Sequence, residues 1–223
     1  KIISYFSFAF QVLKGSNFKT RTKNRSDINF LRELLNGNQK KRLAVFVAYH
    51  EPDSLSQSNL NHLKILKENN FQIMYVHNGL LKNNIKEKLT RFGCFVICRE
   101  NVGTDIGAYK DSLCLLNHYK LNRNLEWILL CNDSTFCLGG INSEKFISNF
   151  EKSLNERNID FIAQNINFMP TVHYQTYFLC LSRKVFLDKR FIEFWDKYIP
   201  LNYRYHAINN GEIKLTTKVL RYF

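Results

Sequence analysis

The sequence predicts an α/β fold with a mostly parallel sheet and helices on both of its faces. With 223 residues, of which 45% are hydrophobic and only three are Pro, the chain can bury the core of one α/β domain. From residue 43 onward, apolar runs alternate with segments of helical periodicity. These runs are nearly continuous, which is typical of parallel strands that are covered on both faces.

Four apolar runs rich in β-branched and aromatic residues predict four strands. They are LAVFVAY (43–49), FQIMYV (71–76), FGCFVIC (92–98) and WILLC (127–131). Parallel strands joined by right-handed helical crossovers end at one edge of the sheet, and ligands of such sheets bind there.

Helices are predicted between these strands. Ser54 and Gln57 form a capping box that would start the first helix, which carries leucines at helical spacing. Three further segments repeat apolar residues every three or four positions: Leu81, Ile85, Leu89 and Phe92; Ile106, Tyr109, Leu113 and Leu116; Phe146, Ile147, Phe150 and Leu154.

The second half of the chain has a different pattern. Strands are predicted over 160–168 and 172–182, separated by a Met-Pro turn that is too short for a helical crossover. An antiparallel addition to the sheet is therefore expected. Short helices are predicted over 191–198 and 211–220.

The net charge of +13 is concentrated at the N-terminus. Residues 1–42 hold ten Lys and Arg against two Asp and Glu, a net of +8, beside the aromatic run KIISYFSFAFQVL. The aromatic run is too short, and its flanks are too polar, to span a bilayer, and no small-residue cleavage site of a signal peptide follows it. The basic segment would lie on an anionic membrane surface or pack as a basic helix on the domain. Nucleic acid is the other usual partner of a basic chain, but no basic–aromatic motif or zinc module accompanies the charge.

The six cysteines do not form a C-x-x-C pair, and four lie in apolar runs: Cys94, Cys98, Cys131 and Cys180. Reduced core cysteines are favoured over disulfides or zinc ligands, which indicates the cytoplasm. The chain lacks G-x-S-x-G and H-E-x-x-H, so a covalent triad and a zincin site are not indicated.

Polar residues follow all four strands: Tyr49 and His50; His77 and Asn78; Glu100 and Asn101; Asn132, Asp133 and Ser134. After the third strand, Gly103 and Gly107 permit close backbone approach, and a helix starting near Asp105 would point its positive end at a diphosphate. The pattern is neither G-x-G-x-x-G nor a Walker motif, and the alternative is a helix-start turn with Asp105 as its N-terminal charge.

Two further segments suggest ligand contacts. A carboxylate at the end of a buried strand, such as Asp133, needs a partner, and Mg²⁺ or Mn²⁺ would be one; the alternative is an Asx turn. In VHYQTYF, His173, Gln175 and Tyr177 would share one face of a strand. His173 would then contact phosphate or metal. The alternative is a half-buried histidine whose hydrogen bonds are satisfied within the protein.

Four segments in this order resemble the rhamnan synthesis protein F family: ENVGTDIGAYK (100–110), NDS (132–134), HYQTYF (173–178) and FW (194–195). The resemblance runs from about Leu43 to Leu220, and members commonly read HLQSYF at the third segment. These bacterial GT-A-type glycosyltransferases help to build rhamnose-containing and other surface polysaccharides. Residues 1–42, the basic aromatic segment, fall outside the resemblance. For residues 43–223 a single glycosyltransferase-like domain is expected, with a nucleotide-binding half (43–140) and an acceptor half (141–223) that would be truncated if the chain is a fragment.

The resemblance also implies roles for individual residues. Tyr49, His50 and Asn78 would lie near base and ribose, and Asn101, Gly103 and Asp105 near the nucleotide or the sugar hydroxyls. Asn132, Asp133 and Ser134 would replace the Asp-x-Asp motif, and with one carboxylate instead of two the metal dependence stays open. His173 and Gln175 would face the diphosphate, with Asp133 and His173 as metal ligands. Glu212 would be the base that activates the acceptor, or a helix-start Glu stabilised by the dipole; Asp105 and Asp133 are rival bases.

The expected function is transfer of a hexose or deoxyhexose from a nucleotide diphosphate to a growing glycan in the cytoplasm. The acceptor would be a glycan or lipid-linked glycan at the inner face of the membrane. Two alternatives stay open: a non-catalytic nucleotide- or sugar-binding module of a larger polysaccharide synthase, and a basic nucleic-acid-binding α/β protein. The acidic residues among the strand ends argue against the second alternative.

Overall fold

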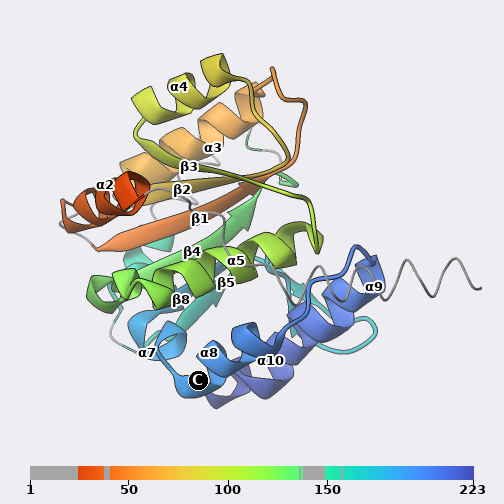
Figure 1. Cartoon of the computed structure of the whole chain (residues 1–223). Coiled ribbons are helices and arrows are strands. Elements are labelled where there is room, and N and C mark those ends of the chain that lie inside the picture. Colours follow the sequence, from red (N-terminus) through yellow and green to blue (C-terminus); the bar gives the residue numbers. More distant parts are fainter. Residues whose placement is uncertain (1–24, 38–40, 136, 138–148, 157) are drawn as a thin grey trace, which may run out of the picture.

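The protein is built on a six-stranded sheet with strand order β3-β2-β1-β4-β8-β5 (Figure 1). The computed structural model describes residues 25–37, 41–135, 137, 149–156 and 158–223. The strands are β1 Arg42–Ala48, β2 Phe71–Asn78, β3 Cys94–Arg99, β4 Trp127–Asn132, β5 Phe161–Ala163 and β8 Phe178–Ser182. The first four are parallel, β8 runs antiparallel to β4, and β5 runs antiparallel to β8. This Rossmann-like sheet confirms the predicted fold class and the antiparallel addition.

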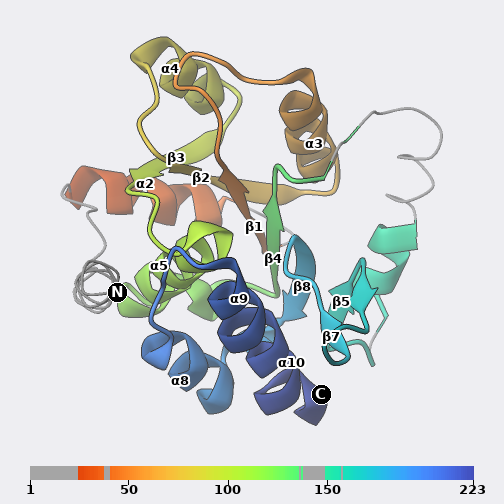
Figure 2. The same ribbon diagram turned by 90° about the vertical axis from the view of Figure 1, so that its right-hand side faces the viewer.

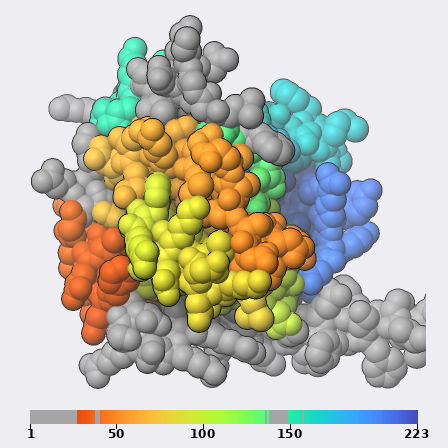
Figure 3. Space-filling view, turned by 90° about the horizontal axis from the view of Figure 1, so that it is seen from above, coloured from red at the N-terminus to blue at the C-terminus, as the bar shows by residue number. Residues whose placement is uncertain are grey.

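The sheet is covered on both faces because its central strands are apolar on both faces. All seven residues of β1 are buried; Leu43, Val45 and Val47 join one core cluster, whereas Ala44, Phe46 and Ala48 join the other. Helices α3 (Gln57–Glu68) and α4 (Asn83–Arg91) cover one face, as Figure 3 shows from above. Helices α5 (Thr104–His118), α8 (Lys189–Lys197) and α10 (Lys214–Lys218) cover the other, and the short α7 (Arg183–Phe186) follows β8.

Helix α3 begins two residues later than the predicted capping box would place it. Its N-cap is Ser56, whose hydroxyl accepts a hydrogen bond from the backbone N–H of Asn59 at 3.0 Å. Ser54 instead donates to the carbonyl of Glu51 in the preceding turn. The predicted N-cap residue, Ser54, was therefore wrong, although the predicted helix is present.

Helix α2 (Arg25–Asn36) packs on the sheet domain. Ile28, Leu31 and Leu35 are buried in the same core cluster as β1 and α5. This agrees with a helix packed on the domain for that part of the basic segment, whereas residues 1–24, with the aromatic run, lie outside the described residues. Within the described ranges, no helix is long and apolar enough to cross a membrane.

The C-terminal half is more broken than the sequence indicated. The strand expected over 160–168 is divided into β5 and β6 (Ile166–Asn167), and the strand over 172–182 into β7 (His173–Tyr174) and β8. β6 and β7 pair antiparallel as a separate hairpin. Because a turn at residues 176–177 interrupts the strand, the predicted two-residue alternation of faces fails beyond Tyr174.

The last helical region starts earlier than predicted. α9 (Arg204–His206) continues into a π-helix (Ala207–Ile213) and then into α10, and a 3₁₀ turn (Leu220–Tyr222) follows. Another 3₁₀ turn (Leu121–Asn124) precedes β4. For the remaining predicted helix, Phe150 and Leu154 are buried as expected, whereas Phe146 and Ile147 lie outside the described residues. All six cysteines are free, and Cys94, Cys131 and Cys180 are buried.

Candidate functional site

The polar residues that follow the parallel strands lie at one edge of the sheet, which Figure 2 views. Asp133 follows β4 next to the end of β1. Its backbone N–H donates to the carbonyl of Val47 at 3.0 Å, and one carboxylate oxygen accepts the N–H of Tyr49 at 2.9 Å. The side chain of Asp133 therefore holds the ends of two strands together while remaining partly exposed.

Asn132 links β4 to the start of α5. Its Oδ1 accepts the N–H of Ser134 at 3.1 Å, so the predicted Asx turn is present. Its Nδ2 donates to Oδ2 of Asp105 at 2.5 Å. One buried amide thus sets both the turn at Asp133 and the orientation of Asp105.

Asp105 occupies the first turn of α5. Burial, together with the charges of Asp133 and Glu212, raises the pKa of this carboxyl to about 6, while the Asn132 hydrogen bond and Arg99 oppose the rise. Burial also raises the pKa of Asp133, against the Tyr49 N–H and His50. The charges of two carboxyl groups from separate parts of the chain, Asp133 and Glu212, therefore both act on Asp105.

Glu212 is held by residues far away in the sequence. Its Oε1 accepts two hydrogen bonds from Thr176, one from the backbone N–H at 2.8 Å and one from the hydroxyl at 3.0 Å. Its Oε2 lies 3.7 Å from Nε2 of His173. Glu212 lies within the π-helix, so its description as a helix-start Glu was wrong; π-helical turns are frequent at functional sites.

Several buried polar atoms in this part of the molecule have no hydrogen-bond partner among the described residues. They are His173 Nε2, the hydroxyls of Tyr109 and Tyr198, and Asn101 Oδ1. Burial raises the pKa of Tyr109 well above its usual value, with further contributions from Asp105, Glu212 and Asp133. Because buried polar groups are normally hydrogen-bonded, these atoms indicate a place for polar ligand groups or water.

The glycines after β3 serve packing. Gly103 has φ +77°, and a Cβ there would lie 2.2 Å from Cβ of Pro200; a Cβ on Gly107 would lie 2.1 Å from the carbonyl oxygen of Val102. The N–H of Gly103 donates to Oδ1 of Asn202 at 2.6 Å. This donor, expected to hold a nucleotide or sugar, is thus already bound to a side chain of the C-terminal half.

On the side of β2, His50 and Asn78 have different environments. Nε2 of His50 lies 2.7 Å from the Tyr75 hydroxyl, and its ring lies 4.5 Å from that of His77. Asn78 is 1% exposed, and its Oδ1 accepts a hydrogen bond from Arg99. The side chain of Asn78 is therefore buried inside the protein behind the edge of the sheet, and its predicted contact with the nucleotide has no support.

The sequence analysis did not select Arg99 and Asp111, which form a buried ion pair with 2.7 Å between Nε and Oδ2. Arg99 also donates to the carbonyl of Val102 at 2.7 Å and thereby holds the start of the 100–103 loop. The only sequence signal was an Arg at the end of an otherwise apolar strand.

The predicted metal ligands have different partners. His173 is 1% exposed and its Nδ1 lies 2.8 Å from the carbonyl oxygen of Thr171, with Nε2 facing Glu212, whereas Asp133 is bound to Tyr49. Gln175 accepts from the Tyr177 hydroxyl at 2.9 Å. In the part of the chain that the structure describes, no three His, Cys, Asp or Glu side chains form a group that could hold a metal ion.

Residues 73–222 match the family described as rhamnan synthesis protein F, which covers about two thirds of the chain. The chain belongs to this family. The match confirms the family that the sequence resembles, although it starts in β2, whereas the resemblance was expected from Leu43 onward.

One relative of this chain is an uncharacterized protein, y4gN, of Sinorhizobium fredii. It is 26% identical over 174 residues, which is 78% of this chain and 44% of the relative. The chain thus spans less than half the length of that relative. No solved structure matches the chain described here.

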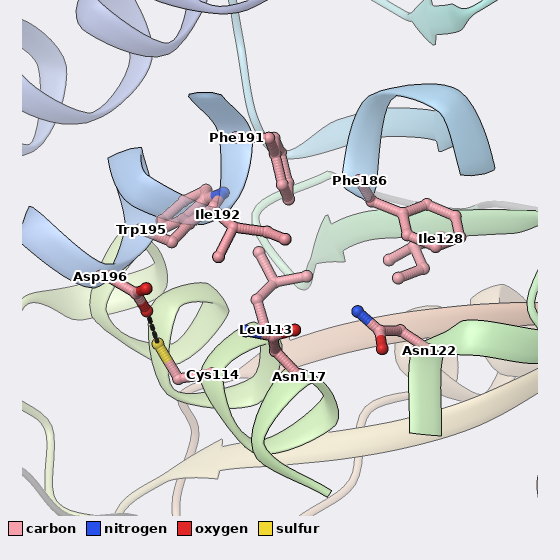
Figure 4. A pocket seen from close by; sticks show the side chains of 10 residues that line it. All are labelled: Leu113, Cys114, Asn117, Asn122, Ile128, Phe186, Phe191, Ile192, Trp195 and Asp196. Atoms are coloured by element: carbon pink, nitrogen blue, oxygen red, sulfur yellow. Dashed lines mark hydrogen bonds between the residues drawn. The ribbon is translucent and has the colours of Figure 1, made fainter. Parts of the chain in front are cut away.

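Apart from the candidate site, a small cavity lies between α5 and α8, as Figure 4 shows. Its volume of about 20 Å³ suits one water molecule, and Leu113, Phe191 and Trp195 line it with other, mainly apolar side chains. Cys114 on its wall donates to Asp196 at 3.7 Å, and burial raises the pKa of this thiol to about 11. The cavity is too small for a sugar nucleotide, and its thiol is a poor nucleophile.

Proposed function

We propose that this chain is a GT-A-type glycosyltransferase that moves rhamnose, or another hexose or deoxyhexose, from a nucleotide diphosphate to a growing surface polysaccharide. One observation carries the proposal. In a member of the rhamnan synthesis protein F family, Asp105 and Asp133 follow strands at the carboxyl edge of a Rossmann-like sheet, and the charges of Asp133 and Glu212 both act on Asp105. Ligands bind at that edge in open α/β sheets, and an inverting transfer to a hydroxyl uses a general base, which a carboxylate can supply.

In the proposed reaction, Glu212 takes the proton of the acceptor hydroxyl. Thr176 occupies Oε1, so Oε2 is the oxygen that faces the acceptor beside Nε2 of His173. As the acceptor oxygen bonds to the anomeric carbon, the bond from that carbon to the phosphate oxygen breaks and the nucleoside diphosphate leaves. Asp105 would hydrogen-bond the donor sugar, and its pKa of about 6 makes it the rival base.

A divalent cation belongs to the proposal only as a partner of the bound diphosphate. Asp133 would supply one oxygen, and phosphate and water oxygens the rest, as is usual for Mg²⁺. When bound, the ion would neutralise charge on the leaving diphosphate.

The test is a thermal-shift panel of UDP, dTDP, GDP and CMP nucleotides with and without Mg²⁺ or Mn²⁺, together with transfer assays. A nucleotide at about 100 times its Kd should stabilise the protein by about 2.7 kcal/mol, and Asp133→Ala should reduce that shift. Glu212→Gln should keep the shift but lower kcat by about 10²- to 10⁴-fold. If no nucleotide shifts the melting temperature, the proposal is wrong.

The second candidate is a non-catalytic nucleotide- or sugar-binding module of a larger polysaccharide synthase. It is favoured by one observation: the chain matches only 44% of its Sinorhizobium fredii relative. An absence of transfer by the wild type, with nucleotide binding intact, would select this candidate, whereas transfer that is lost in Glu212→Gln would exclude it.

A further inference from the structure

A second hollow lies beside the candidate site, over the segment that leads into the last helical region. It encloses about 720 Å³, within the range of small-molecule pockets. Its lining among the described residues consists of Ile199, Leu201, Tyr203, Tyr205, His206, Asn209 and Asn210. Figure 2 shows α9, which starts in this segment, on the side of the molecule where the parallel strands end.

Two tyrosines dominate the exposed part of this lining. Tyr203 and Tyr205 are 60% and 66% exposed, and their ring centroids lie 5.7 Å apart. Exposed aromatic rings that lie next to each other form an apolar patch, and such patches often mark interaction sites. Behind them, His206 is fixed between the carbonyl of Ile199 at 2.8 Å and the amide of Asn210 at 3.0 Å.

The hollow is connected to the strand edge by hydrogen bonds. Asn202 accepts the N–H of Gly103 at 2.6 Å and donates to the carbonyl of Asn101 at 2.9 Å, and Pro200 packs on Gly103. Along the same helical region, which is π-helical from Ala207 to Ile213, Glu212 follows His206 by six residues, at most about 9 Å along the axis at the α-helical rise. A short oligosaccharide can span that distance.

The chemistry of the lining suits a neutral carbohydrate. None of the seven lining residues is Asp, Glu, Lys or Arg. Tyrosine rings present a π face to the apolar C–H face of a sugar, and deoxyhexoses such as rhamnose add a methyl group to their apolar surface. Asn209 and Asn210 bring amide groups, which donate to and accept from sugar hydroxyls.

We propose that the hollow lined by Tyr203, Tyr205 and His206 binds the acceptor glycan and directs its end toward Glu212. This inference rests on the proposed glycosyltransferase function and adds the acceptor subsite to it.

The test is calorimetric binding of a short rhamnose oligosaccharide to the whole chain. In the double variant Tyr203→Ala/Tyr205→Ala, the Kd should rise about tenfold, because two ring contacts are lost. Tyr203→Phe/Tyr205→Phe should bind within about twofold of the wild type, since the ring faces remain. Tyr222→Ala, which removes a tyrosine that is 50% exposed but lies outside the hollow, is the matched control and should not change the Kd.

The nucleotide thermal shift separates the two proposals. If the double variant keeps this shift while its oligosaccharide Kd rises, both proposals hold. An unchanged Kd in the double variant, or no oligosaccharide binding by the wild type, overturns the acceptor subsite, and a retained nucleotide shift then leaves the donor site standing. In assays of transfer, the double variant should raise the acceptor KM and leave kcat nearly unchanged.

Discussion

At the scale of single residues, Asp105 carries the largest electrostatic cost among the candidate carboxylates. Its carboxyl is partly buried, bonded to Asn132 and placed near two other carboxylates. Ionisation is therefore less favourable in the folded protein than in the unfolded chain. Such a cost is common at functional sites, where activity is maintained at the expense of stability.

We predict that Asp105→Asn stabilises the protein at neutral pH. The ordinary pKa of 3.8 rises to about 6 on folding, so the folded protein holds a proton that the unfolded chain releases between these values. The free energy of unfolding therefore falls as the pH rises through this window, and the full cost of about 1–3 kcal/mol is present above it. Urea unfolding at pH 7.5 should show Asp105→Asn more stable by that amount, and at pH 3.5 equal to the wild type. A gain of the same size at both pH values would contradict the assignment.

At the scale of elements, the loop from β3 to α5 joins the two halves of the chain. Gly103 uses a left-handed conformation to bring its backbone against Pro200, and Asn202 bonds to the N–H of Gly103 and to the carbonyl of Asn101. Arg99 holds the same loop from behind through Val102. The loop therefore positions Asp105 and the segment that starts the last helical region.

We predict that Gly103→Ala destabilises the protein more than Gly93→Ala. Both glycines have positive φ, +77° and +91°, so both variants incur the cost of a left-handed alanine. Only at Gly103 would the new methyl meet Pro200, at 2.2 Å, whereas at Gly93 it would meet the flexible end of Lys67 at 3.3 Å. Urea unfolding should show Gly103→Ala less stable than Gly93→Ala by about 1–3 kcal/mol, the usual cost of overpacking. Equal losses would mean that the loop can move away from Pro200.

At the scale of the whole molecule, the core extends beyond the predicted domain boundary at residue 43. Leu31 of α2 is fully buried in the cluster that contains β1, α5 and α8. Helix α2 therefore contributes apolar burial to the same face of the sheet as the helices of the candidate site. The sequence left two alternatives open for the basic residues 1–42, a membrane-surface segment or a helix packed on the domain, and the burial of α2 agrees with the second for residues 25–36.

We predict that Leu31→Ala costs about 2–5 kcal/mol of unfolding free energy, as for other buried leucines, if α2 is part of the domain. Leu80→Ala is the matched control, because Leu80 is 78% exposed, and its cost should stay within about 0.5 kcal/mol. Chemical denaturation of both variants measures the difference. A cost for Leu31→Ala as small as that of Leu80→Ala would place α2 outside the cooperative unit.

The sequence by itself determined the parallel strands, the crossover helices and the edge at which polar residues collect, because hydrophobic periodicity reports which faces each segment buries. Within the candidate site, it also indicated Asp105, Asn132 and Asp133, which follow directly from strand ends. Only the tertiary structure placed Glu212 with Thr176 and His173, and bound Gly103 to Asn202, across distances of 36 to 99 residues in the chain. It also decided that Asn78 is buried behind the edge. These contacts depend on how helices and hairpins pack against the completed sheet, and local patterns of residues carry no information about partners so far apart.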